Sequence, residues 1–433
     1  MKRASQGWVS SVVAASCLLM GAPAWADDAD NQVLKQEISE LKSRLSQLES
    51  RLASQPSGGV STAEKTGLPT LQLPSGLQSL QISGYADVSY IYNFDKPDAG
   101  KTRTNRGRVF DVQSSGFTPQ AFELVLEKPL SNDSPIGFRT DLFFGDDAEV
   151  IHATGLPTLT SGTEAFDLQQ AYVTLRAPVG EGLDFKVGKF VTLLGAEVIE
   201  SPANWNFSRS YMFGFSIPFT HTGALVSYPI LGEYGSATVG VVNGWDIVDE
   251  NNQFKTMIGS LTLTPIKDVS FSINGINGAE RTNDNRNDRT VLDLVASWKP
   301  IEQLTLMGNY DYGHESGVTH GVLGTTGFDT GNWEGLALYA KYDLTPKWAL
   351  AGRWEIFNDM DNVRTGLTGP GGSTLDNLHF YEWTFTSQWT LYEHVLARLE
   401  YRHDWSNERV FFHDKSAFRD YQDTIAAELI CHF

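Results

Sequence analysis

From about residue 80 to its C-terminus, the chain alternates apolar and polar residues, and this feature most constrains its fold. Residues 269–274 read VSFSIN, and residues 348–356 and 395–402 show the same period of two. Side chains with this period point to opposite faces of a β-strand. The alternating blocks are about 9–13 residues long, which suits a tilted strand that crosses a membrane.

Sixteen such blocks follow one another, and the joints between them alternate in length. The blocks begin near residues 80, 118, 135, 166, 182, 219, 235, 254, 268, 289, 302, 332, 347, 378, 393 and 421. Seven joints are short and turn-like, namely LSNDSP, APVGEG, LGEYG, TPIKD, KPIEQ, LTPK and LYEH. The intervening joints are mostly longer and polar, and they include residues 95–116, 146–165, 195–217, 315–331, 358–377 and 406–420.

The joints favour a membrane barrel over a soluble β-sandwich, whose strands would alternate in the same way. An up-and-down barrel in an outer membrane has short periplasmic turns and long external loops. After the N-terminus, no stretch reaches the length of apolar helix that a bilayer requires. The sequence therefore predicts an all-β transmembrane fold, an up-and-down antiparallel barrel of about 16 strands with a water-filled lumen, over residues 80–433.

The last block ends the chain on an aromatic residue. Ile425, Leu429 and Phe433 share one face of this block. A terminal Phe on an alternating final strand resembles the signal by which outer-membrane proteins are recognised for assembly. We therefore expect Phe433 to act as an assembly signal read by the barrel assembly machinery. Aromatic residues also gather near predicted strand ends, among them Trp298 and Trp348, as interfacial girdles require.

The N-terminal residues predict export. Lys2 and Arg3 precede an apolar core at residues 9–20, and Ala24-Trp25-Ala26 follows it, so residues 1–26 read as a cleaved signal peptide. An uncleaved anchor is the alternative, but the apolar run is too short to span a bilayer. Cys17 could also mark a lipoprotein site, although apolar residues continue beyond it.

Residues 27–53 predict a coiled-coil helix. Leu and Ile recur at residues 34, 38, 41, 45, 48 and 52, which is the spacing of a heptad seam. Flanking charges favour self-association, with two, three or four strands left open. An amphipathic helix docked on another surface is the alternative. Residues 54–79, rich in Ser, Gly, Pro and Thr, predict a flexible linker.

Composition excludes several functions. A formal net charge of −19 would repel nucleic-acid phosphates, so no nucleic acid is expected as a partner. Only Cys431 remains after signal cleavage, and no Cys/His spacing resembles a zinc site. No GxSxG, HExxH or phosphate-binding glycine motif occurs either. We therefore predict no catalytic residues, no cofactor and no metal.

The stretch from 166 to 229 carries a family resemblance. Its AYV, GLDFKVGKF and SRSY…HTG segments follow in the order seen in β-barrel porins of the OmpL-like class, and the GYADVSYIYNF start fits the same pattern. The resemblance covers roughly residues 80–433. It implies an outer-membrane pore in a Gram-negative cell, without catalytic residues. The heptad segment also resembles the periplasmic coiled coils that precede some trimeric porins.

Charged residues on the predicted lumen face, together with three in the joint 195–217, are the candidates for lining or narrowing a pore. They are Arg139, Asp141, Arg176, Lys186, Glu197, Glu200, Arg209, Arg353, Glu355, Arg398, Glu400 and Arg402. Opposed charges in a hydrated lumen can bias which ions pass. The alternative for each is a salt bridge within the wall.

Together these features predict a porin for passive diffusion of small hydrophilic solutes or ions. We expect outer-membrane lipid and lipopolysaccharide around a homo-trimer. The alternatives are a structural protein that contacts the cell-wall layer and, less favoured, a barrel hydrolase.

The joint 195–217 is unusually aromatic for an external loop. It contains Trp205, Phe207, Tyr211, Phe213 and Phe215, whose exposure to water would cost roughly 25 cal/mol per Å² of apolar surface. Folding inward against the lumen wall would bury these rings and narrow the pore. Packing at a trimer contact or on neighbouring loops is the alternative.

Overall fold

The computed structural model describes residues 79–97, 104–131, 134–157, 165–318, 329–414 and 417–433. The predicted signal peptide (1–26) and coiled coil (27–53) lie outside these residues, as does the linker apart from residue 79. The chain divides into one unit of residues 1–72 and a second of residues 73–433. Within the part that is described, no helix has both the length and the apolar character to cross a bilayer.

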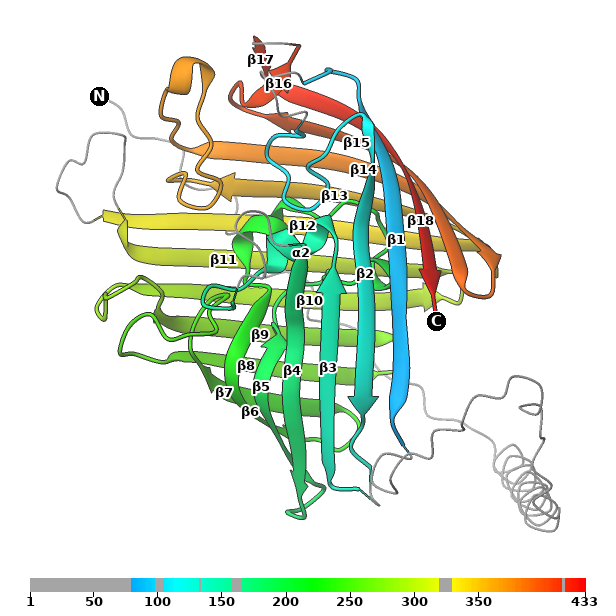
Figure 1. The fold of residues 1–433 in the computed structure, drawn as a ribbon, viewed down its shortest axis with the longest axis vertical. Helices are drawn as coiled ribbons and strands as arrows, with labels where there is room; N and C mark the ends of the chain where they lie inside the picture. Colours follow the sequence, from blue (N-terminus) through cyan, green and yellow to red (C-terminus); the bar gives the residue numbers. More distant parts are fainter. Residues whose placement is uncertain (1–78, 98–103, 132–133, 158–164, 319–328, 415–416) are drawn as a thin grey trace, which may run out of the picture. The chain divides into compact units, whose positions relative to one another are not determined.

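The second unit is a closed antiparallel barrel, in which each strand pairs with its neighbours in chain order and β18 pairs with β1 (Figure 1). The barrel strands are β1 (Gln81–Asn93), β2 (Gly116–Lys128), β3 (Ile136–Phe144), β4 (Phe166–Ala177), β5 (Leu183–Val191), β6 (Thr220–Pro229), β7 (Gly235–Val242), β8 (Thr256–Ile266), β9 (Val269–Ala279), β10 (Asp288–Ile301), β11 (Leu304–Val318), β12 (Asp329–Thr345), β13 (Trp348–Asp359), β14 (Leu378–Tyr392), β15 (Val395–Ser406) and β18 (Tyr421–His432). Each predicted start lies within three residues of an observed one. The predicted all-β barrel of sixteen strands is confirmed for the described residues.

Short turns and long loops alternate around the barrel, as predicted. The turn between β8 and β9 has only residues 267–268, and Asp268 adopts a positive φ of 66°, which Asp tolerates in tight turns. The remaining described elements all lie in the long loops. They are α2 (Asp146–Ile151), the short helices η2 (Ser201–Ala203), η3 (Met212–Ser216) and η4 (Pro370–Gly372), and the hairpin β16 (Phe411–His413) with β17 (Ala417–Arg419).

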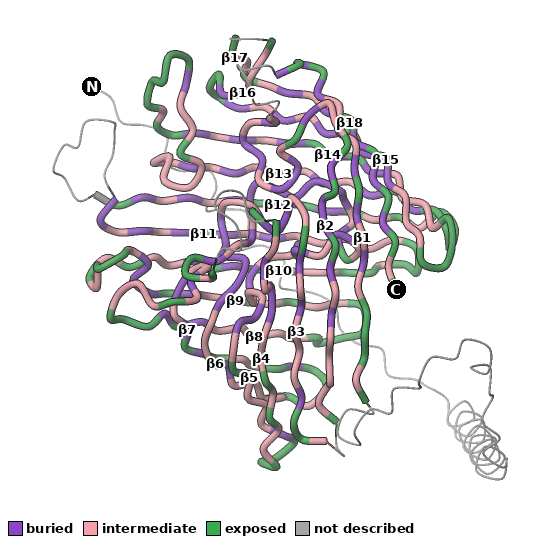
Figure 2. The backbone as a smooth tube through the Cα atoms, in the orientation of Figure 1, coloured by how far each residue is buried: buried purple, intermediate pink, exposed green. Residues whose placement is uncertain are grey.

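The barrel is apolar on its outer face and polar on its inner face. Along β14 the outward rings of Trp383 and Phe385 are 45% and 56% exposed, whereas Glu382 and Thr384, which alternate with them, are fully buried. Figure 2 shows the same alternation of exposed and buried residues along many strands. A soluble β-sandwich would have the opposite pattern, because its apolar face would form the core. This inversion identifies a barrel whose outer surface faces lipid.

Tryptophans on the outer face support this orientation. Trp298 and Trp348 are 52% and 41% exposed, and both lie at the short-turn ends of their strands. Trp389 pairs in register with Trp348 and so lies at the same level. These positions suit an aromatic girdle at one membrane interface. Trp354, in contrast, lies in the middle of β13 opposite Trp383.

An apolar core fills part of the lumen. Wall rings such as Phe357 on β13 and Phe380 on β14 are fully buried. They contact rings from the β5–β6 loop: Phe215 stacks on Phe357, and Tyr211 lies 5.0 Å from Phe380 between ring centroids. The core therefore forms where long loops enter the barrel and meet its inner wall.

Candidate functional site

The β5–β6 connection, residues 192–219, folds into the lumen and is here called the inner loop. Phe207, Tyr211 and Phe213 are at most 5% exposed, while Trp205 and Phe215 are half-buried. The predicted inward folding of residues 195–217 is thus confirmed by their contacts with the wall. Burial of the rings supplies the apolar part of that contact.

Three arginines of β13 and β15 bind the inner loop. Arg353 donates to Glu197 Oε1 and to the carbonyl of Ser208, both at 2.6 Å. Arg398 donates to the carbonyls of Ser201 and Asn204, at 3.1 and 2.6 Å. Arg402 donates to the carbonyl of Arg209 at 2.6 Å. Each guanidinium therefore satisfies loop carbonyls that would otherwise be buried without a donor.

Two carboxylates of the same wall bind backbone N–H groups of the inner loop. Glu355 accepts from Tyr211 N at 2.8 Å and from Met212 N at 2.6 Å. Glu400 accepts from Phe207 N at 2.7 Å and from Ser208 N at 3.0 Å. Carboxylates that accept paired N–H groups make strong, directional contacts. The loop backbone is consequently fixed against β13 and β15 by both signs of charge.

The wall charges also pair with one another. Arg353 and Arg402 both contact Glu382 of β14, and Arg398 pairs with Glu428 of β18 at 2.9 Å. Arg353, Arg398 and Arg402 are at most 2% exposed. Their structural position is therefore between wall and loop, where they hold the loop in place. Their predicted effect on permeating ions stays a prediction.

Arg209 binds its own loop. Its guanidinium donates to the carbonyls of Val198, Phe207 and Ile199 at 3.1, 2.7 and 2.5 Å, and the residue is 5% exposed. Arg209 therefore stabilises the conformation of the inner loop through hydrogen bonds within the loop itself.

A second group of predicted residues lies on β3 to β5, away from the residues of β13 and β15 that bind the inner loop. Arg139 bonds both carboxylate oxygens of Asp141 at 2.9 Å. Arg176 pairs with Asp184 at 2.7 Å, with side chains 36% and 30% exposed. Lys186 lies 4.4 Å over the ring of Tyr172, a cation–π contact. Arg139, Arg176 and Lys186 are more accessible than the arginines that bind the loop.

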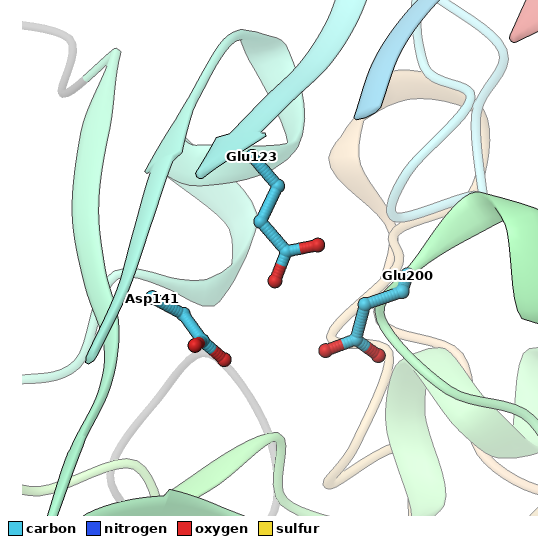
Figure 3. A group of neighbouring side chains, drawn as sticks. All are labelled: Glu123, Asp141 and Glu200. Carbon is cyan, nitrogen blue, oxygen red and sulfur yellow. The ribbon is translucent and has the colours of Figure 1, made fainter. Parts of the chain in front are cut away.

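Glu200 links the inner loop to this second group. A carboxylate oxygen of Glu200 lies within 4.8 Å of one from Glu123 on β2 and one from Asp141 on β3. In Figure 3 the three carboxylates point toward one another from the loop and the two strands. Gln169 of β4 donates to Glu200 at 2.6 Å. The loop therefore approaches both walls: charged residues of both signs bind it on one side, and two acidic residues lie beside its Glu200 on the other.

Two further arginines enter the lumen, and sequence reasoning missed both. Arg108, from the β1–β2 loop, bonds Asp404 at 2.6 Å and Asp111 at 2.5 Å. Phe110 beside it packs on Phe213 of the inner loop. The aromatic residue Phe110 in the segment RGRVFD was a weak sequence signal that this loop packs inside the barrel. The partner Asp404 lies 296 residues away in the chain, and no local sequence pattern indicates a pairing at that separation.

Arg364, in the β13–β14 loop, lies between two tryptophans. Its guanidinium carbon is 4.6 Å from the centroid of Trp245 and 5.0 Å from that of Trp333, and its Nε donates to the carbonyl of Phe215 at 2.6 Å. Burial, with Arg289 adding repulsion, lowers the pKa of Arg364 to about 9. It remains a cation at neutral pH, and it extends the contact of the inner loop to a third external loop.

Phe433 lies at the seam where the barrel closes. Its N–H donates to Gly84 O at 2.9 Å, and Gly84 N donates to Phe433 O at 3.1 Å. The ring is 55% exposed and continues the outward face of Ile425 and Leu429. This position agrees with the predicted face, while the role of Phe433 as an assembly signal stays a prediction.

A closed sixteen-stranded barrel with an apolar exterior, a charged lumen and an infolded loop has the architecture of an outer-membrane porin. Residues 79–433 match the family described as "Putative beta-barrel porin-2, OmpL-like", and the chain belongs to that family. It is thus an outer-membrane β-barrel of a porin family and not an enzyme. No curated protein sequence matches it significantly.

Solved structures share the barrel at low sequence identity. The outer-membrane channel DcaP of Acinetobacter baumannii is 12% identical, with a TM-score of 0.54 over 82% of this chain and 97% of that one. The anion-selective porin from Comamonas acidovorans is 12% identical, with a TM-score of 0.53 over 82% and 99%. OprB of Pseudomonas putida is 12% identical, with a TM-score of 0.53 over 82% and 94%. At such identity the likeness establishes the fold alone.

Proposed function

We propose that this protein is a diffusion porin, which lets small hydrophilic solutes or ions cross the outer membrane without energy input. The observation that carries the proposal is the anchoring of the inner loop inside the barrel by Arg353, Arg398 and Arg402 together with Glu355 and Glu400. The loop is held at the wall of β13 and β15 and reaches the wall of β2 and β3 through Glu200, so that it narrows the lumen to an aperture. The accessible charges of β3 to β5 then face the water that remains.

The mechanism is passage through a narrow, hydrated and charge-lined segment. Charges of both signs lie on the wall opposite β13 and β15: Arg139 pairs with Asp141, Arg176 pairs with Asp184, and Lys186 lies over the ring of Tyr172. In a confined lumen such charges act on ions more strongly than in bulk water, because fewer water molecules screen them. Selectivity then depends on the balance of these charges and on the width that the loop leaves.

We further propose that the mature chain begins after residue 26 and assembles as a trimer, with residues 27–53 as a periplasmic coiled coil. A trimer form is known for OmpT of Vibrio cholerae, which has a TM-score of 0.51 and 10% identity. The apolar outer face of the barrel would contact lipid and the acyl chains of lipopolysaccharide.

Single-channel recording in planar bilayers tests the proposed function. Refolded protein should produce stable open steps whose conductance rises with salt concentration, because the lumen is filled with water. The same preparation kept unfolded in urea until addition serves as the control. Folded barrels that insert without conducting would overturn the porin proposal and favour a structural protein.

A further inference from the structure

The three carboxylates of Glu123, Asp141 and Glu200 come from separate parts of the fold. Glu123 and Asp141 lie on neighbouring strands, with Asp141 paired to Val125, and Glu200 directly precedes η2 in the inner loop. Glu123 is 3% exposed and Asp141 is fully buried. Glu200 is half-buried, and three carboxylates in mutual reach repel one another unless a positive charge or a proton lies between them.

Arg139 compensates only part of this charge. Its Nε bonds both oxygens of Asp141, and its nearest contact to another acid is with Glu127, at 3.5 Å. Gln170 also donates to Asp141, at 2.5 Å. Asp141 is thus well satisfied, whereas no described cation forms an ion pair with Glu123 or Glu200. Ionised, the cluster and Arg139 carry two excess negative charges.

Two buried oxygen atoms without hydrogen-bond partners indicate a ligand at this site, independently of the excess charge. Oε1 of Glu123 is buried and has no hydrogen-bond partner among the described residues, although its carboxylate points at the other two. Oε1 of Gln169, a neutral and fully buried residue outside the acidic cluster, is also without a partner. Buried polar atoms are rarely left unpaired, so each one requires an explanation.

A bulge in β4 brings this amide to the site. Gln170 pairs with Asp141 and Leu168 with Leu142, so Gln169 is an extra residue between them. As a result Gln169 and Gln170 both point into the lumen, where they bond Glu200 and Asp141 respectively. Bulges often re-aim a side chain at a functional site. Here the bulge brings a neutral amide to the three carboxylates, with its Nε2 bonded to Glu200.

We propose that Glu123, Asp141, Glu200 and the amide oxygen of Gln169 bind one calcium ion. Ca²⁺ takes carboxylate and amide oxygens at about 2.3–2.6 Å, so ligands on opposite sides of the ion are about 5 Å apart. Separations of no more than 4.8 Å are compatible with this size, and the flexible coordination of Ca²⁺ suits ligands from a loop and two strands better than the near-ideal octahedron that Mg²⁺ demands. Water molecules would complete the coordination.

The bound ion ties the inner loop to the wall of β2 and β3. The basic anchors hold the loop to β13 and β15, and Glu200 is its contact with the opposite wall. Calcium cancels the excess negative charge beside the aperture and immobilises this side of the loop. The site extends beyond the proposed diffusion function, and binding of the ion does not depend on whether the barrel conducts.

Calcium titration by calorimetry tests the site directly. The full mature chain is refolded in detergent from the urea-unfolded state, which avoids calcium bound to lipopolysaccharide, and is then freed of metal with a chelator. We expect one Ca²⁺ per barrel in the unaltered protein. Glu123→Gln and Glu200→Gln, which preserve shape, should each weaken binding by about tenfold or more.

Glu127→Gln is the matched control. Glu127 follows Glu123 by four residues on β2, so both side chains point to the same face of the strand. Glu127 is half-exposed, however, and lies outside the cluster. This variant should keep the affinity for Ca²⁺. Resistance to heat-induced unfolding on gels establishes that each variant is folded, and added Ca²⁺ should raise that resistance only in the unaltered protein and Glu127→Gln.

Three outcomes would overturn the proposal. The folded unaltered protein could bind no Ca²⁺ at millimolar concentrations, which would show that the carboxyls hold protons instead. Glu123→Gln and Glu200→Gln could retain full affinity, which would place calcium elsewhere. Glu127→Gln could lose as much affinity as they do, which would reduce the effect to the diffuse attraction of an acidic surface.

Discussion

Arg353 shows how a single buried charge joins the inner loop to the barrel. It contacts Glu197 of the loop and Glu382 of β14, and it is 1% exposed. Arg353 stabilises the protein less through the net attraction of its ion pairs than by preventing buried carboxylates from losing their partner. In its absence Glu197 would be a buried carboxylate without a cation among the described residues, and Glu382 would keep only Arg402, which is costly in a medium of low polarity.

Arg353→Met should therefore destabilise the protein by about 3–5 kcal/mol and release the loop. Urea unfolding followed by tryptophan fluorescence measures the first effect, and bilayer conductance, expected to rise and fluctuate, measures the second. Arg176→Met is the control, because the pair with Asp184 is one-third exposed and should contribute about 0–1 kcal/mol. Equal losses in the two variants would contradict the anchoring role of Arg353.

Asp147, in α2 of the β3–β4 loop, makes stability depend on pH. Burial raises its pKa from 3.8 to about 8, and the residue is 3% exposed. The folded protein thus keeps a proton that the unfolded chain releases near pH 4. Stability from this group is complete below about pH 4 and is lost as pH rises toward about 8.

Asp147→Asn should remove this dependence, because an amide does not titrate. The variant should match the unaltered protein near pH 4 and exceed it by about 1–3 kcal/mol near pH 8. The temperature at which the folded band disappears on gels, measured across this pH range, checks the effect. Glu149→Gln, on the exposed side of the same helix, should leave the pH profile as it is. Parallel profiles for Asp147→Asn and the unaltered protein would refute the assignment.

At the scale of elements, the inner loop and the external loops act as one packed body. The inner loop is in contact with Phe110 from the β1–β2 loop, and Arg364 from the β13–β14 loop bonds the carbonyl of Phe215. The walls supply side chains, and the loops supply backbone groups together with side chains such as Glu197 and Phe215. The aperture therefore depends on loop conformation as much as on strand number.

Shortening residues 203–213 should widen the aperture. The deletion removes the backbone groups that Glu355 and Glu400 bind, so single-channel conductance should rise roughly twofold or more while the barrel still folds. Deleting residues 370–373, an exposed stretch of the β13–β14 loop, is the control and should leave conductance unaltered. Equal conductance in both deletions would place the inner loop outside the permeation path.

Phe433 belongs to the last strand, and its ring can be tested apart from its backbone. Phe433→Ala keeps both backbone bonds to Gly84 and removes the ring. We expect less heat-modifiable barrel in the outer membrane, with export to the periplasm unaffected. Phe433→Trp keeps a terminal aromatic ring and should assemble normally. Full assembly of Phe433→Ala would remove the ring from the assembly signal.

At the scale of the whole molecule, residues 27–55 are predicted to hold barrels together. Three heptads are marginally stable alone, so helix and barrel contacts should support one another. Deleting residues 27–55 should weaken the trimer without unfolding the barrel, which native mass spectrometry and heat-modifiability measure separately. Deleting residues 56–70, which removes a shorter stretch from the linker, is the control. An oligomer unchanged by the first deletion would exclude the role of the coiled coil.

The sequence alone determined the strands, their number and their inner and outer faces. This was possible because the period of two is a local property: residues such as Arg353 and Trp354 belong to opposite faces whatever the rest of the chain does. The aromatic content of residues 195–217 likewise predicted burial, because exposed rings are costly wherever they lie.

Only the tertiary structure decided which groups meet. Arg353 and Glu197 are 156 residues apart, and Glu200 meets Glu123 and Asp141 only because the loop crosses the lumen. Strand parity placed Arg353, Arg398 and Arg402 on the lumen face but could not reveal that a loop covers them. Partners at such separations follow from barrel closure and loop path, which no local pattern records. The strands were therefore predictable, whereas the site that they enclose required the fold.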